Sequence, residues 1–183
     1  VIAADAGYAH VRSVGATPNL AVGDFDSLGF VPADCPIEEF PAHKDMSDLE
    51  IALGRAAELG FKRIVVFGAL GGRLDHTIAN MQLLARFAEE GLETIVVGLD
   101  SVMGYVVGPG LLQLPSGHTG TVSVFSLCEE SQGVTEEGLE YGLEDARLTN
   151  RTTLGLSNEL MGNSASIAVE KGTLVVFYPL DCL

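Results

Sequence analysis

The chain has 183 residues, of which 47% are hydrophobic and 19% charged, and its formal net charge is −15. This length and composition indicate a globular protein of one or two domains and exclude an intrinsically disordered one. With 10 basic against 25 acidic residues, the chain is unsuited to nucleic acid, whose phosphates require clustered Lys and Arg, so we expect no nucleic-acid partner.

The apolar runs and the cysteines favour a cytoplasmic protein. No run approaches the ~18 residues of a membrane span and no signal-peptide pattern is present, so we expect no membrane partner. The cysteines are odd in number and lack CxxC spacing, which predicts reduced thiols: Cys35, Cys128 and Cys182.

The first half of the chain alternates short apolar runs with helical patterns, which is typical of βαβ units and a parallel sheet. Ser47 and Glu50 form a capping box that predicts a helix ending at Gly60, and a second helix is expected from about Asp75 to Gly91. The expected strands are Val1–Ala4, Leu20–Val22, Ile64–Phe67 and Thr94–Val97.

After about residue 102 the helical periodicity ends and short alternating runs replace it. Residues 139–143 alternate in hydrophobicity, and Lys171-Gly172 predicts a hairpin turn between Ile167–Val169 and Leu174–Tyr178. We therefore expect an α/β fold in which an N-terminal parallel-sheet domain precedes an antiparallel β-sandwich, with the division at residues 1–104 and 105–183. Because residues 1–5 already look like a strand that reaches its polar end, and no initiator Met is present, we expect a further piece of the chain upstream of Val1.

Two aspartates, Asp24 and Asp26, follow the apolar strand Leu20–Val22 in the sequence "GDFDS". Two neighbouring carboxylates repel each other, so water or a positive charge has to lie between them. At the carboxyl edge of a parallel sheet this pair could hold a hard cation such as Mg²⁺. The alternative is an Asx turn that caps the loop.

The sequence "KDMSD" precedes the first predicted helix. Asp45 and Asp48 lie about one turn apart, and Lys44 is one of the few basic residues that could meet a phosphate group. Acidic residues also stabilise a helix N-terminus without any functional role, and capping alone would account for them.

A glycine-rich turn, "GALGGRLDH", lies between a predicted strand and the second helix. Glycines at such a turn let backbone N–H groups approach an anion, and Arg73 adds a bidentate phosphate donor. His76 and Asn80 lie on one face of the helix that follows. The alternative is a plain glycine turn with Asp75 as N-cap. The downstream sequence "GLSNE", which contains Ser157 and Asn158, indicates only a loop by itself.

In this order and spacing, "DAG" at residues 5–7, "GDFDS", "KDMSD", "GGRLDH" and "GLSNE" resemble the thiamine pyrophosphokinase family. The resemblance extends over nearly the whole chain. It implies Mg²⁺-dependent transfer of a pyrophosphoryl group from ATP to the hydroxyl of thiamine, which gives thiamine diphosphate and AMP. It also implies a homodimer with thiamine sites at the interface.

The resemblance implies a role for each motif residue. The expected metal ligands are Asp24, Asp26 and Asp48, and these with Asp45 are the expected catalytic residues. The expected nucleotide-binding residues are Asp5, Gly7, Ser27, Lys44, Gly71, Gly72, Arg73, His76 and Asn80. The expected thiamine-binding residues are Asp75, Ser157 and Asn158.

Three departures from the family pattern are visible. The family's ADGG reads Ala4-Asp5-Ala6-Gly7 here, its KDxTD has Ser47 in place of Thr, and its first strand and nucleotide-facing loop would precede Val1. Two other functions remain open. One is a haloacid-dehalogenase-type phosphatase with Asp24 as nucleophile, although Leu28 stands where that signature has Thr or Val; the other is a non-catalytic sensor of thiamine or nucleotide.

Overall fold

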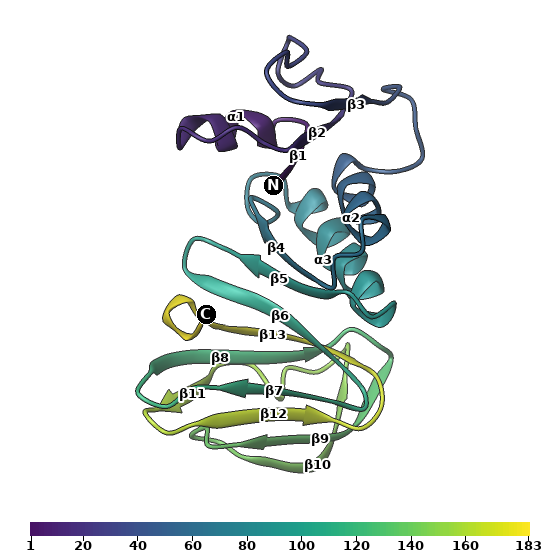
Figure 1. Ribbon diagram of the computed structural model, residues 1–183. Coiled ribbons are helices and arrows are strands. Elements are labelled where there is room, and N and C mark those ends of the chain that lie inside the picture. Colours follow the sequence, from purple (N-terminus) through teal and green to yellow (C-terminus); the bar gives the residue numbers. More distant parts are fainter. The chain divides into compact units, whose positions relative to one another are not determined.

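The computed structural model describes residues 1–183, which form two compact units. The first unit comprises Val1–Lys62 and the second Arg63–Leu183 (Figure 1). None of the three α-helices combines the length and the apolar character that crossing a membrane requires.

The first unit contains a three-stranded parallel sheet in the order β1-β2-β3, with two helices. Helix α2 packs against β1 and β2, and helix α1 contacts β1. The elements are β1 (Ile2–Ala4), α1 (Gly7–Ser13), β2 (Leu20–Gly23), β3 (Ile37–Glu39) and α2 (Asp48–Glu58). The parallel N-terminal sheet expected from the sequence is thereby confirmed, while α1 and β3 were not predicted.

Helix α2 begins as its sequence predicts. The Ser47 side chain accepts a hydrogen bond from the Glu50 backbone N–H at 3.2 Å, which is the first half of a capping box. The helix turns Ile51, Ala52, Leu53 and Ala56 inward, and all four are buried. The cap therefore fixes both the start of the helix, at Asp48, and the direction of the chain just before it, where Lys44 lies.

The second unit is a β-sandwich with one helix. A four-stranded sheet has the order β10-β9-β12-β7, and a six-stranded sheet has the order β11-β8-β13-β6-β5-β4. The elements are β4 (Arg63–Phe67), α3 (Leu74–Glu89), β5 (Glu93–Val97), β6 (Ser101–Val107), β7 (Gly110–Leu114), β8 (Thr119–Ser126), β9 (Glu130–Glu137), β10 (Leu143–Thr149), β11 (Asn158–Met161), β12 (Ala165–Val169), β13 (Thr173–Pro179) and the 3₁₀ helix η1 (Leu180–Cys182).

The two sheets enclose one hydrophobic core. Alternate residues of β8 and β13, such as Val122 and Val176, meet Val134 and Ile167 from the four-stranded sheet, and all four are 0% exposed. On its other face the six-stranded sheet contacts α3, and the Tyr105 hydroxyl donates to the Met81 carbonyl at 2.9 Å. The expected β-sandwich is confirmed.

Two local predictions for this half are wrong. The chain segments around Lys171-Gly172 do not form a hairpin, because β12 pairs with β7 and β9 whereas β13 pairs with β6 and β8. The turn instead carries the chain from one sheet to the other, and Gly172, at φ +104°, packs against Ser131. Residues 139–142 form no regular strand, although Leu139 makes an isolated bridge to Leu160, and Leu143 begins β10.

The boundary of the compact units differs from the division expected from the sequence. Residues 104 and 105 lie inside β6, which pairs with β5 on one side and with β13 on the other. Strands β4 and β5 are parallel to each other, as expected, yet they extend the sandwich sheet. The division into functional domains at residue 104 stays a prediction, because a continuous sheet joins the strands on both sides of it.

Candidate functional site

Three carboxylates gather where two parallel strands of the first unit end. Asp5 follows β1, and Asp24 and Asp26 follow β2. One carboxylate oxygen from each lies within 4.8 Å of the others, which is a spacing that could hold a metal ion. The sequence predicted two of these residues as metal ligands and assigned Asp5 to the nucleotide.

Strand register explains why the three converge. Ala4 is aligned with Val22 in the β1–β2 pair, so Asp5 and Asp24 leave the same sheet edge one and two residues later. Gly23 allows their close approach, because a Cβ atom there would lie 3.2 Å from Asp5 Cα and 3.3 Å from Asp48 Oδ1. Its φ of +144° would also strain an L side chain.

The backbone at this edge adopts unusual conformations. Asp5 has φ +41° and Phe25 has φ +59°, a region that non-glycine residues visit rarely. Phe25 is only 2% exposed and packs with Ala3, Tyr8 and Ala21, so burial of its ring offsets the cost of this conformation. The buried ring thereby fixes the aspartates on both sides of it.

The aspartate loop contains the Asx turn that the sequence offered as an alternative. The Asp26 backbone N–H donates to Asp24 Oδ1 at 3.1 Å, and Ser27 Oγ donates to Asp26 Oδ1 at 3.1 Å. The hydrogen bond from the Asp26 backbone is the main cause that lowers the pKa of Asp24, and the hydrogen bond and charge of Lys44 lower it further. The turn and a metal site are compatible, because each carboxylate has a second oxygen.

Lys44 supplies the positive charge at this site. Its Nζ lies 3.0 Å from Asp48 Oδ1 and 3.4 Å from Asp24 Oδ2, and all three side chains are largely covered. Burial opposes the charge on Lys44, but the two carboxylates outweigh it and raise the Lys44 pKa. Burial raises the pKa of Asp48, and the negative charges of Asp5 and Asp24 raise it further. Lys44 acts in the opposite direction but does not outweigh them. Asp48 thus borders the three-carboxylate group through Lys44, and its direct contact with a metal stays a prediction.

One oxygen at the site has no partner in the protein. Asp5 Oδ1 is buried and accepts no hydrogen bond. A buried carboxylate oxygen without a partner is costly, and a hard divalent cation would satisfy it. The three oxygen donors Asp5, Asp24 and Asp26 therefore fit Mg²⁺ in chemistry as well as in spacing.

Two residues predicted for this site are not members of the carboxylate group. Asp45 is exposed between Lys44 and the start of α2, and it makes no ion pair with Lys44. Gly7 is the first residue of α1, and space for a side chain is open there. Their expected roles stay predictions.

The glycine-rich turn of the second unit is held by the helix that follows it. Asn80 Nδ2 donates to the Ala69 carbonyl at 2.8 Å, and Gly71 N–H donates to Thr77 Oγ1 at 3.2 Å. Gly71 and Gly72 have φ of +89° and +66° with open space around them. Asn80 therefore positions the turn, which leaves its backbone exposed to solvent.

Arg73 and Asp75 form an exposed bidentate pair at the start of α3. Arg73 Nη2 lies 2.6 Å from Asp75 Oδ2, and Arg73 Nε lies 3.2 Å from Asp75 Oδ1. The hydrogen bond from Arg73 is the main cause that lowers the pKa of Asp75 to about 2. The N-cap of α3 is Arg73, so the alternative prediction of Asp75 as N-cap is wrong. His76 is exposed beside this pair.

Ser157 and Asn158 differ sharply in their surroundings. Ser157 is exposed at φ +59°, and its backbone N–H donates to Ser123 Oγ at 3.1 Å. Asn158 is 5% exposed, and its amide donates to Glu136 Oε2 at 2.9 Å and to the Tyr141 carbonyl at 2.6 Å. Asn158 Oδ1 accepts from the N–H groups of Tyr141 and Glu159. All hydrogen-bonding positions of the Asn158 amide are thus used within the protein.

A groove of about 400 Å³ lies beside Ser157 on the outer face of the six-stranded sheet. It is lined by Asp100, Ser101, Thr119, Gly120, Thr121, Ser123, Phe177 and Pro179. The Phe177 ring is held edge-on by Phe125 at 6.1 Å. No sequence motif indicates this groove, because most of its residues come from β6, β8 and β13, which pair over long range.

Glu136 is a buried carboxyl behind the Ser157 loop, at 2% exposure, and its Oε1 has no partner. Burial raises the pKa of Glu136 above its ordinary value of 4.5. As the pH rises above about 4.5 the unfolded chain ionises this group before the folded chain does, so the free energy of unfolding falls.

We expect Glu136→Gln to abolish the fall in the free energy of unfolding that ionisation of Glu136 causes, since glutamine keeps the acceptor for Asn158 and carries no charge. Its melting temperature at pH 7 should exceed that of the unmodified chain by about 2–4 °C, and the difference should shrink toward pH 4. Calorimetry at both pH values measures it. A lower melting temperature for the variant at pH 7 would contradict the assignment.

Comparison with known proteins matches both halves of the chain. The thiamin pyrophosphokinase catalytic domain matches residues 1–96, and the thiamin pyrophosphokinase vitamin B1 binding domain matches residues 112–174. A thiamine pyrophosphokinase of Bacillus subtilis (strain 168) is 28% identical over 187 residues, which cover 98% of this chain and 87% of the relative.

Solved structures agree with this match. The crystal structure of a thiamine pyrophosphokinase from Bacillus subtilis has a TM-score of 0.85 at 26% identity and covers 98% of this chain and 87% of that one. A thiamin pyrophosphokinase structure from Geobacillus thermodenitrificans has a TM-score of 0.81 at 31% identity, covering 100% and 87%. Fold, motif order and both domain matches therefore place this chain in the thiamin pyrophosphokinase family.

Proposed function

We propose that this chain is a thiamine diphosphokinase. The hydroxyl oxygen of thiamine attacks the β-phosphorus of ATP, the bond from that phosphorus to the α–β bridging oxygen breaks, and AMP leaves. The hydroxyl proton is lost, and the products are thiamine diphosphate and AMP. The observation that carries the proposal is the three-carboxylate group of Asp5, Asp24 and Asp26, in which buried Asp5 Oδ1 has no partner, in a chain that matches both domains of the family.

We propose Mg²⁺ as the cation held by Asp5, Asp24 and Asp26. When bound, Mg²⁺ neutralises the charge that develops on the phosphate oxygens of the nucleotide. The protein's own part is to present three oxygen donors on a fixed turn and to keep Lys44 beside them. Lys44 holds Asp24 and Asp48 in place. Because the metal would supply most of the positive charge that faces the phosphates, few further basic residues are required in this strongly acidic chain.

The nucleotide contacts are proposed for the glycine turn. The exposed backbone of the turn offers the Gly72 N–H to phosphate, and Arg73 offers a planar fork of donors, whereas the Gly71 N–H donates to Thr77 Oγ1 in the protein alone. In the protein alone Asp75 accepts both donors of that fork, so a phosphate would have to replace Asp75. His76, Ser27, Gly7 and Asp45 keep the roles expected from the family resemblance as proposals.

The thiamine contacts are proposed for Ser157 and the groove beside it. Ser157 presents an exposed hydroxyl next to Ser123, which lines the groove, and Phe177 offers an aromatic face for the cationic ring of thiamine. Asn158 acts through Ser157 by holding its loop.

The direct test is product formation. The purified chain is incubated with thiamine, ATP and Mg²⁺, and thiamine diphosphate and AMP are separated by chromatography. Equal amounts of both products are expected. Release of ADP in place of AMP, or phosphate release from a monophosphate ester without ATP, would support another enzyme. Binding of both substrates without product would support the non-catalytic sensor.

We expect Ser157→Ala to raise KM for thiamine about tenfold, because one hydrogen bond to the substrate is lost, while KM for ATP changes little. Initial rates with each substrate varied in turn measure both constants. Thr152→Ala, at an exposed loop position outside the groove, is the matched control. A larger change in KM for ATP than for thiamine would contradict the assignment of Ser157.

We further propose a homodimer formed around the Ser157 loop. Three apolar side chains near it are unusually exposed: Tyr141 at 66%, Leu154 at 59% and Leu156 at 50%. Apolar side chains gathered on one surface are typical of protein interfaces.

The three unpaired cysteines fit a cytoplasmic location, which we propose on that ground.

Leu156→Asp should convert the dimer to a monomer, because a charge would have to be buried at the interface. Light scattering after size-exclusion chromatography measures the mass. Val14→Asp, at a position 79% exposed in the first unit, is the control and should leave the mass unchanged. A dimer that persists in Leu156→Asp would remove this surface from the interface.

A further inference from the structure

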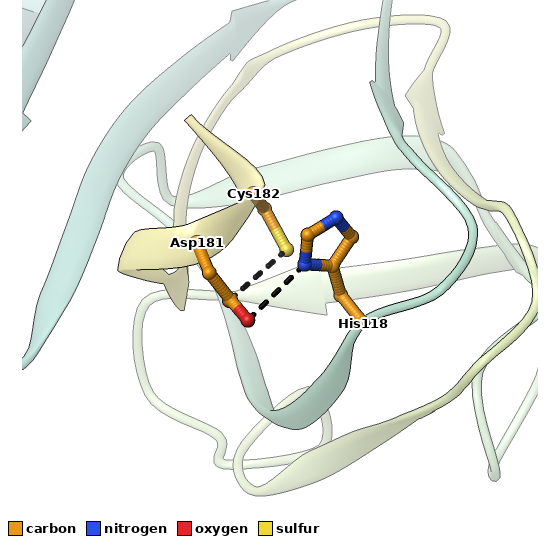
Figure 2. A group of neighbouring side chains, drawn as sticks. All are labelled: His118, Asp181 and Cys182. Carbon is orange, nitrogen blue, oxygen red and sulfur yellow. Dashed lines mark hydrogen bonds and ion pairs between the residues drawn. The ribbon is translucent and has the colours of Figure 1, made fainter.

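A second cluster of metal-binding side chains lies in the sandwich unit, far along the chain from the aspartate loops. His118 precedes β8, and Asp181 and Cys182 lie on η1 after β13. Figure 2 shows the imidazole, the carboxylate and the thiol turned toward one another. One ligand atom from each lies within 4.8 Å of the others.

The cluster is organised by the fold before any ion binds. His118 Nδ1 lies 3.1 Å from Asp181 Oδ2, and Cys182 Sγ lies 3.9 Å from Asp181 Oδ1. The backbone of the His118 turn is fixed by two hydrogen bonds with Gly162, one from Gly117 N–H at 2.9 Å and one to the His118 carbonyl at 3.1 Å. Cys182 packs against the sandwich core. Both halves of the cluster therefore have rigid supports.

The donor set selects the type of metal. A thiolate sulfur and an imidazole nitrogen are the ligands that Zn²⁺ prefers, and a carboxylate is its usual oxygen ligand. Mg²⁺ prefers oxygen donors alone, so this cluster differs in kind from the aspartate group of the first unit. The sides of a zinc tetrahedron are about 3.3–3.8 Å, so small side-chain rotations would close the cluster onto the ion.

We propose that His118, Asp181 and Cys182 form a Zn²⁺ site with three protein ligands and one position open to water or another ligand. Zinc would bind Nδ1 of the neutral His118 imidazole, with the ring proton on Nε2, and the Cys182 thiol would lose its proton to solvent as the sulfur–zinc bond forms. The ion would tie η1 to the start of β8.

The position of the site gives it a structural consequence. Pro179, just before η1, and Gly120, just after His118, both line the groove beside Ser157. A Cβ atom on Gly120 would lie 3.0 Å from Pro179 Cγ, so the two strands are already in close contact there. Zinc would fix this end of the groove and stabilise the sandwich unit.

Metal binding tests the proposal without substrates. The reduced, chelator-treated chain is titrated with Zn²⁺ against a chromophoric chelator, and one tightly held zinc per chain is expected. His118→Ala and Cys182→Ser should each weaken binding at least about tenfold, while Cys128→Ser, which removes another half-buried thiol, should bind as the unmodified chain does.

Two further readouts keep the result clear if a variant is unstable. Co²⁺ in place of Zn²⁺ should give a thiolate charge-transfer band that is absent in Cys182→Ser, and Zn²⁺ should raise the melting temperature of the unmodified chain but not of His118→Ala. Stoichiometric binding that survives both substitutions, or no binding by the unmodified chain, would overturn the site.

Discussion

Asp24→Asn should reduce kcat/KM for thiamine diphosphate formation by at least about a hundredfold while the chain still folds. Asp24 belongs to the three-carboxylate group and also contacts Lys44, so its charge serves both the proposed metal and the lysine that faces it. An asparagine there keeps Oδ1 as acceptor for the Asp26 N–H, and the turn is preserved. Loss of the 3.4 Å contact with Lys44 should change the free energy of unfolding little.

Three measurements separate a metal role from a structural one. Initial rates give kcat/KM, calorimetric titration gives the affinity for Mg²⁺, and denaturant unfolding gives stability. We expect kcat/KM and the affinity for Mg²⁺ to fall together, while the free energy of unfolding stays nearly constant. Glu58→Gln, which neutralises an exposed carboxylate paired with Arg55 in the same unit, is the control and should change none of them. Near-normal turnover in Asp24→Asn would remove this residue from the metal site.

Local sequence patterns predicted the elements better than their partners. The cap of α2 depends on Ser47 and Glu50, three residues apart, and the structure contains it. The strands on both sides of Lys171-Gly172 were predicted, but not that they belong to different sheets. Alternating hydrophobicity shows that a segment is extended, whereas pairing depends on residues far away, such as Gln132, whose N–H donates to the Lys171 carbonyl.

The same limit applies to the candidate site. Asp24 and Asp26 were found because they follow one strand directly. The family resemblance assigned Asp5 to the nucleotide, and its position beside Asp24 was not predicted, because that position depends on the register of β1 with β2. Asp48 was grouped with the ligands on family resemblance, and the structure shows Lys44 between it and Asp24. A short motif reveals which side chains are present but not which neighbour each one faces.

Asn158 is a predicted thiamine-binding residue whose amide is already hydrogen-bonded within the protein. The sequence grouped it with Ser157 as a thiamine ligand, yet its buried amide is fully occupied by Glu136, Tyr141 and Glu159. We therefore expect Asn158→Ala to lower the free energy of unfolding by about 2–4 kcal/mol, because the Glu136 carboxyl and the Tyr141 backbone lose their partners inside the protein. Denaturant unfolding measures this change.

The double variant Asn158→Ala, Glu136→Gln tests the cause of that loss. Once Glu136 is neutral, removal of Asn158 should cost about 1 kcal/mol less than in the unmodified chain, because no buried charge is left without a partner. KM for thiamine should rise in Asn158→Ala through the displaced Ser157, and less than additively when Ser157→Ala is combined with it. If Asn158→Ala were as stable as the unmodified chain and still raised KM for thiamine severalfold, Asn158 would contact the substrate directly, as the family resemblance first implied.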